Sequence, residues 1–218
     1  MFVKICGITN EDDALLAVAL GADAIGFVFA PSVRQLQPVR ARDIVRRLPP
    51  EVLTVGVFRD ESRQRVVDLV NQVGLKCAQL HGHESAGDTK WVREHVPFVI
   101  KAFVAGDPRL EQFDDYGADV ALIDSQAPGS GRVFDWSLAE GAPQHRRVML
   151  AGGLTPENVT AAVRRARPWG VDVSTGVERA PGRKDPIKLR EFIERAKASE
   201  RKPYRGVDEE PYDWEDDE

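Results

Sequence analysis

Short apolar runs separated by stretches with helical spacing repeat along most of the chain. The runs are four to eight residues long, the length of a buried parallel strand, and amphipathic segments connect them. Strands that alternate with helices pair in parallel, and eight such units favour a single closed (β/α)8 TIM barrel over an open doubly wound sheet. The predicted strands are Phe2–Cys6, Ala22–Phe29, Leu53–Phe58, Cys77–Leu80, Phe98–Phe103, Val120–Ile123, Val148–Ala151 and Val171–Ser174.

Capping residues indicate where three of the connecting helices begin. Asn10 precedes an acidic first turn, and Gly21 is placed to end that helix. Thr155-Pro156 and Asp185-Pro186 each put a capping side chain before a proline suited to the first helical position. We therefore expect helices to start at Glu11, Pro156 and Pro186.

Charge is unevenly distributed along the 218 residues. The chain has 30 Lys+Arg and 35 Asp+Glu, a net charge of −5, yet residues 207–218 alone hold eight acids and no base. Residues 1–206 consequently carry 27 acids and 30 bases, a charge of about +3. Because the segment from Ser199 is polar, acidic and broken by prolines, we expect a barrel domain over residues 1–198 and a short disordered acidic tail over 199–218.

Several classes of protein fit the sequence poorly. The N-terminus lacks the basic and apolar regions of a signal peptide, and no apolar run is long enough to span a membrane. No GxGxxG follows the first strand, which argues against dinucleotide binding. Neither the two cysteines nor His83 and His95 have the spacing of a metal site. We expect a cytoplasmic protein, a monomer or homodimer, that binds neither nucleic acid nor membranes.

Candidate chemistry lies where the predicted strands end, because (β/α)8 barrels build their active sites at the carboxyl ends of the strands. Asp124, directly after an apolar strand, is a candidate catalytic carboxylate, although it could also cap the next loop. A lone cysteine is more often a small buried residue, and Cys77, inside its strand, is assigned to the core. His81 could act in catalysis or only form hydrogen bonds within its own loop. The polar side chains expected at this mouth are Cys6, Arg34, Arg59, Asp60, Gln79, His81 and Asp124.

Two glycine-containing segments follow the last two strands. Phosphate sites of these barrels form from the loops after strands seven and eight, where glycine admits an anion close to the backbone N–H groups and hydroxyls add donors. The alternative is that the glycines only make tight turns. The predicted phosphate-binding residues are Gly152, Gly153, Ser174, Thr175 and Gly176.

An ordered set of motifs over residues 2–193 resembles the phosphoribosylanthranilate isomerase family. No single motif is specific, but their order along the chain is. They are Lys4-Ile5-Cys6-Gly7-Ile8-Thr9, Gly26-Phe27-Val28-Phe29 with Ser32 and Arg34, Gln79-Leu80-His81-Gly82, Asp124 followed by Gly129-Ser130-Gly131 and Phe134-Asp135-Trp136, Leu150-Ala151-Gly152-Gly153-Leu154, Asn158-Val159, and Asp172-Val173-Ser174-Thr175-Gly176-Val177-Glu178.

This resemblance implies an enzyme of tryptophan biosynthesis. Its reaction would be the Amadori rearrangement of N-(5-phosphoribosyl)anthranilate to 1-(2-carboxyphenylamino)-1-deoxyribulose 5-phosphate. The resemblance implies Asp124 as the acid that protonates the furanose ring oxygen and Cys6 as the base that removes the C2 proton. It also implies that Arg34 binds the anthranilate carboxylate and that Gly153 and residues 174–176 bind phosphate. No metal or cofactor is expected, because the protonated imine is itself the electron sink.

Two departures and two alternatives accompany the resemblance. Thr175 stands where the family usually has a serine, which keeps a hydroxyl, and Pro128 could stiffen a loop that is commonly richer in glycine. One alternative is the related aminoaldose isomerase of histidine biosynthesis, or a bifunctional enzyme, although that chemistry favours a carboxylate where this chain has Cys6. The other is a barrel that binds phosphorylated ligands without catalysis, which predicts loss of the acid or the base.

Overall fold

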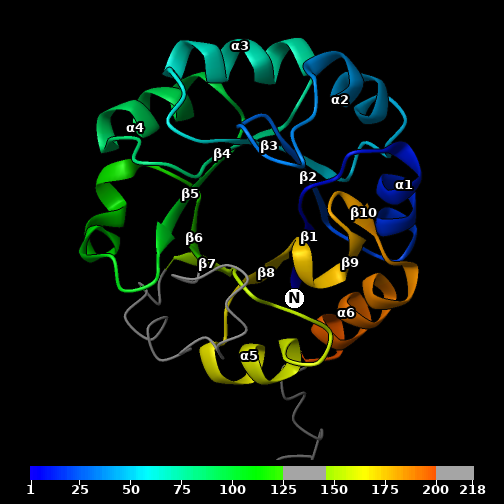
Figure 1. The fold of residues 1–218 in the computed structure, drawn as a ribbon. Helices are drawn as coiled ribbons and strands as arrows, with labels where there is room; N and C mark the ends of the chain where they lie inside the picture. Colours follow the sequence, from blue (N-terminus) through cyan, green and yellow to red (C-terminus); the bar gives the residue numbers. More distant parts are fainter. Residues whose placement is uncertain (125–145, 200–218) are drawn as a thin grey trace, which may run out of the picture.

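The protein forms a closed barrel of eight parallel strands surrounded by helices (Figure 1). A computed structural model describes residues 1–124 and 146–199. Each strand is hydrogen-bonded to the next in sequence order, and β8 closes the ring against β1. The predicted barrel is confirmed. The strands are β1 (Phe2–Ile5), β2 (Ala24–Val28), β3 (Leu53–Phe58), β4 (Cys77–Leu80), β5 (Val99–Val104), β6 (Val120–Asp124), β7 (Arg147–Leu150) and β8 (Gly170–Val173).

Helices lie outside the strands, and a small hairpin follows β8. The helices are α1 (Glu11–Ala19), α2 (Pro38–Val45), α3 (Arg63–Val73), α4 (Ala86–His95), α5 (Val159–Ala166) and α6 (Pro186–Ala198), with 3-10 segments η1 (Pro108–Tyr116) and η3 (Thr175–Val177). The hairpin pairs β9 (Glu178–Ala180) with β10 (Arg183–Lys184) in antiparallel fashion. Of the predicted tail, residues 199–218, the structure describes only Ser199, which caps α6; Pro128 and residues 200–218 lie outside the described residues.

Two of the three predicted helix starts are confirmed. The side chain of Asn10 accepts a hydrogen bond from the N–H of Asp13 at the start of α1. The carboxylate of Asp185 accepts from the N–H groups of Ile187 and Lys188, at the first turn of α6. In both helices the capping side chain satisfies N–H groups that have no partner within the helix.

The predicted start at Pro156 is wrong, because α5 begins at Val159. The side chain of Asn158 accepts from the N–H of Thr155 at 2.8 Å and donates to the carbonyl oxygen of Gly153 at 2.9 Å. These bonds hold the segment before α5 as a turn folded back onto the loop after β7. The Thr-Pro pair therefore belongs to that loop and not to a helix.

Alternation along the strands separates two apolar cores. One buried cluster contains strand side chains such as Ala24, Val55, Ile100 and Met149, and it fills the inside of the barrel. Cys77 belongs to it and is fully buried, which confirms its assignment to the core.

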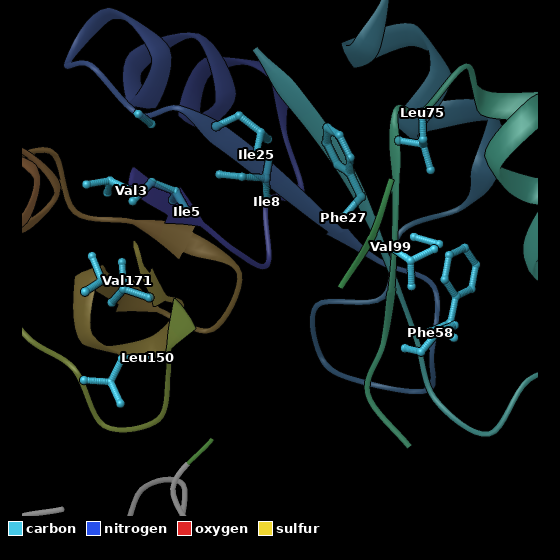
Figure 2. Packing of buried hydrophobic residues seen from close by; sticks show 14 of the residues in the cluster. Val3, Ile5, Ile8, Ile25, Phe27, Phe58, Leu75, Val99, Leu150 and Val171 are labelled. Carbon is cyan, nitrogen blue, oxygen red and sulfur yellow. The ribbon is translucent and has the colours of Figure 1, made fainter. Parts of the chain in front are cut away.

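The second core lies between the barrel and the helices. Figure 2 shows Val3 and Ile5 of β1 and Ile25 and Phe27 of β2 within this layer. Since successive side chains of a strand point to opposite faces, Lys4 and Cys6 lie on the inner side of β1. Because the apolar face of β1 packs against the helices, the side chains of Lys4 and Cys6 on its other face lie inside the barrel.

Candidate active site

A buried ion pair lies beside the Cys6 thiol. Lys4 on β1 is aligned in register with Asp172 on β8, and the Lys4 Nζ lies 2.9 Å from the Asp172 Oδ1. Lys4 is completely buried and Asp172 nearly so. The N–H of Cys6 continues the β1–β8 pairing by donating to the carbonyl oxygen of Val173 at 2.8 Å. The junction between β1 and β8 thus brings a thiol, an ammonium and a carboxylate together.

Burial and the neighbouring ammonium have opposite effects on the pKa of the Cys6 thiol. Burial raises the pKa of the Cys6 thiol, because a thiolate is poorly solvated there, while the charge of Lys4 and a hydrogen bond from it favour the thiolate. Burial alone would lower the pKa of Lys4, but attraction to Asp172 and Cys6 raises it above its usual range. Lys4 therefore stays cationic next to the thiol and partly offsets its burial.

Gly26 on β2 leaves room for this arrangement. A Cβ atom built on Gly26 would lie 3.0 Å from the Cys6 Sγ and 3.1 Å from the Lys4 Nζ. Both distances are shorter than ordinary van der Waals contact, so a side chain here would displace the thiol or the ammonium.

Asp124 is held by a histidine on the other side of the mouth. The Asp124 Oδ2 lies 3.1 Å from the His81 Nε2, and the His81 Nδ1 lies 2.8 Å from the amide nitrogen of Gln79. The contact with Gln79 fixes the orientation of the imidazole ring, so that its other nitrogen faces Asp124. His81 thus links β4 to β6, beyond its own loop. Asp124 and His81 are both half-buried.

Arg34 makes a two-pronged contact with Glu178. The Arg34 Nε donates to the Glu178 Oε1 at 2.7 Å, and Nη2 donates to Oε2 at 2.6 Å. Burial opposes ionisation of Glu178, but the hydrogen bond from Arg34 and the charge of Lys184 outweigh it and hold the pKa of Glu178 below its usual range. This contact uses one edge of the guanidinium, and its outer pair of N–H groups remains suited to a second carboxylate.

The loops after β7 and β8 approach each other closely. Gly152 and Gly153 have positive φ angles of 83° and 65°, which glycine adopts without strain. A Cβ atom built on Gly176 would lie only 1.9 Å from the carbonyl oxygen of Leu154. Only glycine lets these two loops meet. Thr175, in the β8 loop, is exposed.

The predicted site residues therefore surround one mouth of the barrel. Cys6 follows β1 and Asp124 is the last residue of β6. Because β7 and β8 lie between these strands, a thiol and a carboxyl group lie on different sides of the opening. Such an arrangement can deliver a proton to one atom of a ligand and remove a proton from another. The guanidinium and the glycine loops can hold anionic groups at its ends.

Four charged residues of this mouth were missed as site residues in the sequence: Lys4, Asp172, Glu178 and Lys184. A usable signal existed for the first two. Lys4 and Asp172 interrupt apolar strands, and a buried charge requires a partner.

Comparisons with known proteins identify the family. A model of the family described as N-(5'phosphoribosyl)anthranilate (PRA) isomerase matches residues 3–195. An N-(5'-phosphoribosyl)anthranilate isomerase of Desulforudis audaxviator is 52% identical over 202 residues, covering 89% of this chain and 97% of that protein. The chain belongs to the N-(5'-phosphoribosyl)anthranilate isomerase family. It is an isomerase of tryptophan biosynthesis, and the family expected from the motifs is confirmed.

Solved isomerases of the family share the fold. One is in complex with reduced 1-(o-carboxyphenylamino)-1-deoxyribulose 5-phosphate, and it matches with a TM-score of 0.80, 41% identity, and coverage of 91% of this chain and 99% of that one. Another represents monomers of the dimeric isomerase of Thermotoga maritima, with a TM-score of 0.80, 40% identity, and coverage of 91% and 99%. Family members thus include one bound to a phosphorylated analogue and one that is dimeric.

Within residues 1–124 and 146–199, no helix is both long and apolar enough to cross a membrane. In the same part of the chain, no three side chains of His, Cys, Asp or Glu are grouped as metal ligands would be.

Proposed function

We propose that this isomerase performs the rearrangement with Asp124 as general acid and Cys6 as general base. The observation that carries the proposal is the placement of an acid and a thiol on separated strands of one mouth, each with a fixed partner. Asp124 is bonded to His81, and Cys6 lies beside Lys4.

In the first step, Asp124 gives its proton to the furanose ring oxygen. The bond between C1 and that oxygen breaks, and the lone pair of the anthranilate nitrogen forms the C1=N double bond of an iminium ion. Because the imidazole of His81 engages Oδ2, the second carboxyl oxygen is available to carry the proton toward the substrate. General acid catalysis of this kind contributes about 10²–10⁴-fold to a rate.

In the second step, the Cys6 thiolate removes the proton from C2. The electrons of that C–H bond form a C1=C2 double bond, and the iminium nitrogen accepts the displaced pair. The resulting enolamine then tautomerises to the aminoketose. The cationic Lys4 supports this step, because it stabilises the thiolate in a buried position.

The substrate is anionic at both ends, and the mouth offers a cradle for each. We assign the phosphate to Gly152, Gly153 and residues 174–176, where two loops expose backbone N–H groups and hydroxyls. Arg34 is assigned to the anthranilate carboxylate through the edge of its guanidinium that Glu178 does not use.

The alternative substrate is the aminoaldose of histidine biosynthesis, used alone or in addition to the anthranilate substrate. Cys6 in place of a carboxylate at β1 favours the anthranilate substrate alone. Assaying the purified enzyme with both aminoaldoses separates a specific enzyme from a bifunctional one.

The function is tested by genetic complementation. Expression of the full chain should restore growth without tryptophan to a strain that lacks this isomerase, whereas the Cys6→Ser and Asp124→Asn variants should fail while accumulating as folded protein. Failure of the soluble, folded wild-type chain to complement would favour a phosphate-binding barrel without catalysis.

We further propose that the enzyme works in the cytoplasm as a monomer or homodimer, with a phosphorylated small molecule as its ligand and without nucleic acid or membrane partners. Sedimentation of the purified full chain at several concentrations tests the proposed oligomeric state. A mass above that of a dimer would contradict it.

A further inference from the structure

Lys184 lies beneath the site, and its ammonium makes three contacts. It is on β10 and only 1% exposed. The Lys184 Nζ donates to the carbonyl oxygen of Cys6 at 2.6 Å, to that of Ser174 at 3.1 Å and to the Glu178 Oε1 at 3.1 Å. An ammonium has three N–H donors, so these contacts satisfy it completely.

Each acceptor belongs to a different part of the site. Cys6 is the proposed base, Ser174 opens the phosphate loop after β8, and Glu178 holds Arg34 by two hydrogen bonds. We propose that Lys184 is a positioning residue for the reaction, whose ammonium fixes the base, the phosphate loop and the carboxylate-binding arginine relative to one another. This inference rests on the proposed function and deepens it.

The hairpin that carries Lys184 is itself anchored beside β1 and α1 (Figure 1). The N–H of Lys184 donates to the Asp13 Oδ2 of α1 at 2.9 Å, and the Thr9 hydroxyl donates to the carbonyl oxygen of Gly182. The backbone that leads into Lys184 is thus held against the loop that follows Cys6 and against the first turn of α1. Such anchoring suits a side chain that must keep a fixed position.

Burying the ammonium of Lys184 costs free energy, because the charge loses its hydration. Burial lowers the pKa of Lys184, and the charges of Glu178 and the Cys6 thiolate oppose that effect. Replacing a buried ion pair by apolar groups of similar volume is often neutral or stabilising. Stability alone therefore gives little reason for a lysine here, whereas directed hydrogen bonds to three parts of the site do.

The charge of Lys184 also acts on the thiol. Among the described residues, the charged groups that act on Cys6 are Lys4, Asp172, Lys184 and Arg34. Lys4 and Lys184 favour the thiolate, and Asp172 opposes it. Removal of Lys184 should therefore shift ionisation of the thiol to higher pH.

The test compares Lys184→Met with the wild-type chain, both in a Cys77→Ala background so that Cys6 is the sole cysteine. Methionine keeps the bulk and removes the charge and all three donors. Turnover, inhibition by inorganic phosphate and the pH dependence of iodoacetamide alkylation are measured.

We expect kcat to fall and KM to rise, with kcat/KM about 100-fold lower, since small misplacements of reacting groups have effects of this size. Phosphate should inhibit more weakly, and alkylation should require higher pH.

Lys101→Met is the matched control. The Lys101 ammonium is equally buried and also donates to the carboxylate of Glu84 and to backbone carbonyl oxygens, those of Leu80, Gly82 and Ala102. It makes no contact with the base or the phosphate loop among the described residues. Its loss should lower thermal stability comparably while leaving phosphate inhibition and the alkylation profile of Cys6 unchanged.

A folded Lys184→Met variant with wild-type phosphate inhibition and alkylation would overturn the proposal. If that variant does not fold, Lys184→Gln, which retains amide donors without the charge, takes its place under the same criterion. Failure of the proposed function is distinguishable, because it would be seen as retained turnover in Cys6→Ser or Asp124→Asn, whatever Lys184→Met does.

Discussion

Charged side chains at the base of the mouth occur with partners of opposite sign. Lys4 is paired with Asp172, while Glu178 accepts from both Arg34 and Lys184. A buried pair contributes little net stability compared with apolar packing, but removal of one partner costs about 3–5 kcal/mol because a bare charge remains. Substitution of any one of these residues should therefore affect folding as well as turnover.

Glu178→Gln gives a prediction with a defined pH dependence. The pKa of Glu178 is lower in the folded protein than the value of about 4.3 expected in the unfolded chain. Ionised Glu178 therefore stabilises the fold above pH ~4.3. This contribution is lost as the pH falls through the pKa of the folded protein. The variant should be less stable than wild type by about 3 kcal/mol at pH 7. Urea unfolding at a series of pH values measures the difference, which should shrink below pH ~4.3.

If the difference in stability between wild type and Glu178→Gln stayed constant down to the acid transition, the stabilisation by Glu178 would not depend on its charge. Glu191→Gln is a suitable control, since Glu191 forms an exposed pair with Arg195. Pairs of that kind contribute only about 0.3–0.5 kcal/mol.

For single residues, the sequence indicated a position at the mouth more readily for those at the ends of strands than for those within strands. Cys6, Arg34 and Asp124 were predicted at the mouth because each follows a predicted strand. Glu178 and Lys184 could not be assigned in the same way. Their partners are 144 and 178 residues away in the chain, so the contacts depend on closure of the barrel.

Among the elements, the loops after β7 and β8 carry the strictest backbone requirements. Gly153 has a positive φ but open space where a Cβ would lie, whereas Gly176 is in contact with the backbone of Leu154. Substitution by alanine therefore creates backbone strain at Gly153 and a direct clash at Gly176.

We expect Gly176→Ala to weaken inhibition by inorganic phosphate at least 10-fold, because the two loops must move apart. Gly153→Ala should have a smaller effect, with a stability loss of about 1–2 kcal/mol from the left-handed conformation. Inhibition constants and thermal unfolding of both variants are compared. Equal phosphate inhibition in Gly176→Ala and wild type would place the anion elsewhere.

The elements themselves were largely predictable from pattern. Eight apolar runs give eight strands because a parallel strand buried on both faces needs a continuous run. The start of α5 was not predictable from Thr155-Pro156. Asn158 competes for the backbone groups around Gly153, and this bonding is visible only once the loop is folded.

For the whole molecule, the described fold and the family match end close together. The match ends at residue 195, and α6 ends at Ala198 with Ser199 as its cap. The body up to residue 206 carries about +3, and the acidic excess lies beyond it. We propose that residues 1–198 form the complete catalytic unit.

Truncation after Ala198 should accordingly leave kcat and KM within about 2-fold of the full chain. Steady-state kinetics of both proteins provide the comparison. A loss of turnover greater than 10-fold in a folded truncated protein would show that the acidic segment contributes to the site.

The central claim is that one acid and one base, held on separated strands, perform the rearrangement. Its most direct test is steady-state turnover of N-(5'-phosphoribosyl)anthranilate by purified Asp124→Asn and Cys6→Ser variants. Cys77→Ala and Glu191→Gln serve as controls, since Cys77 lies in the inner core and Glu191 forms an exposed pair with Arg195 on α6. Both site variants should lose at least 10²-fold in kcat while both controls remain active. Near wild-type turnover by folded Asp124→Asn or Cys6→Ser would contradict the mechanism.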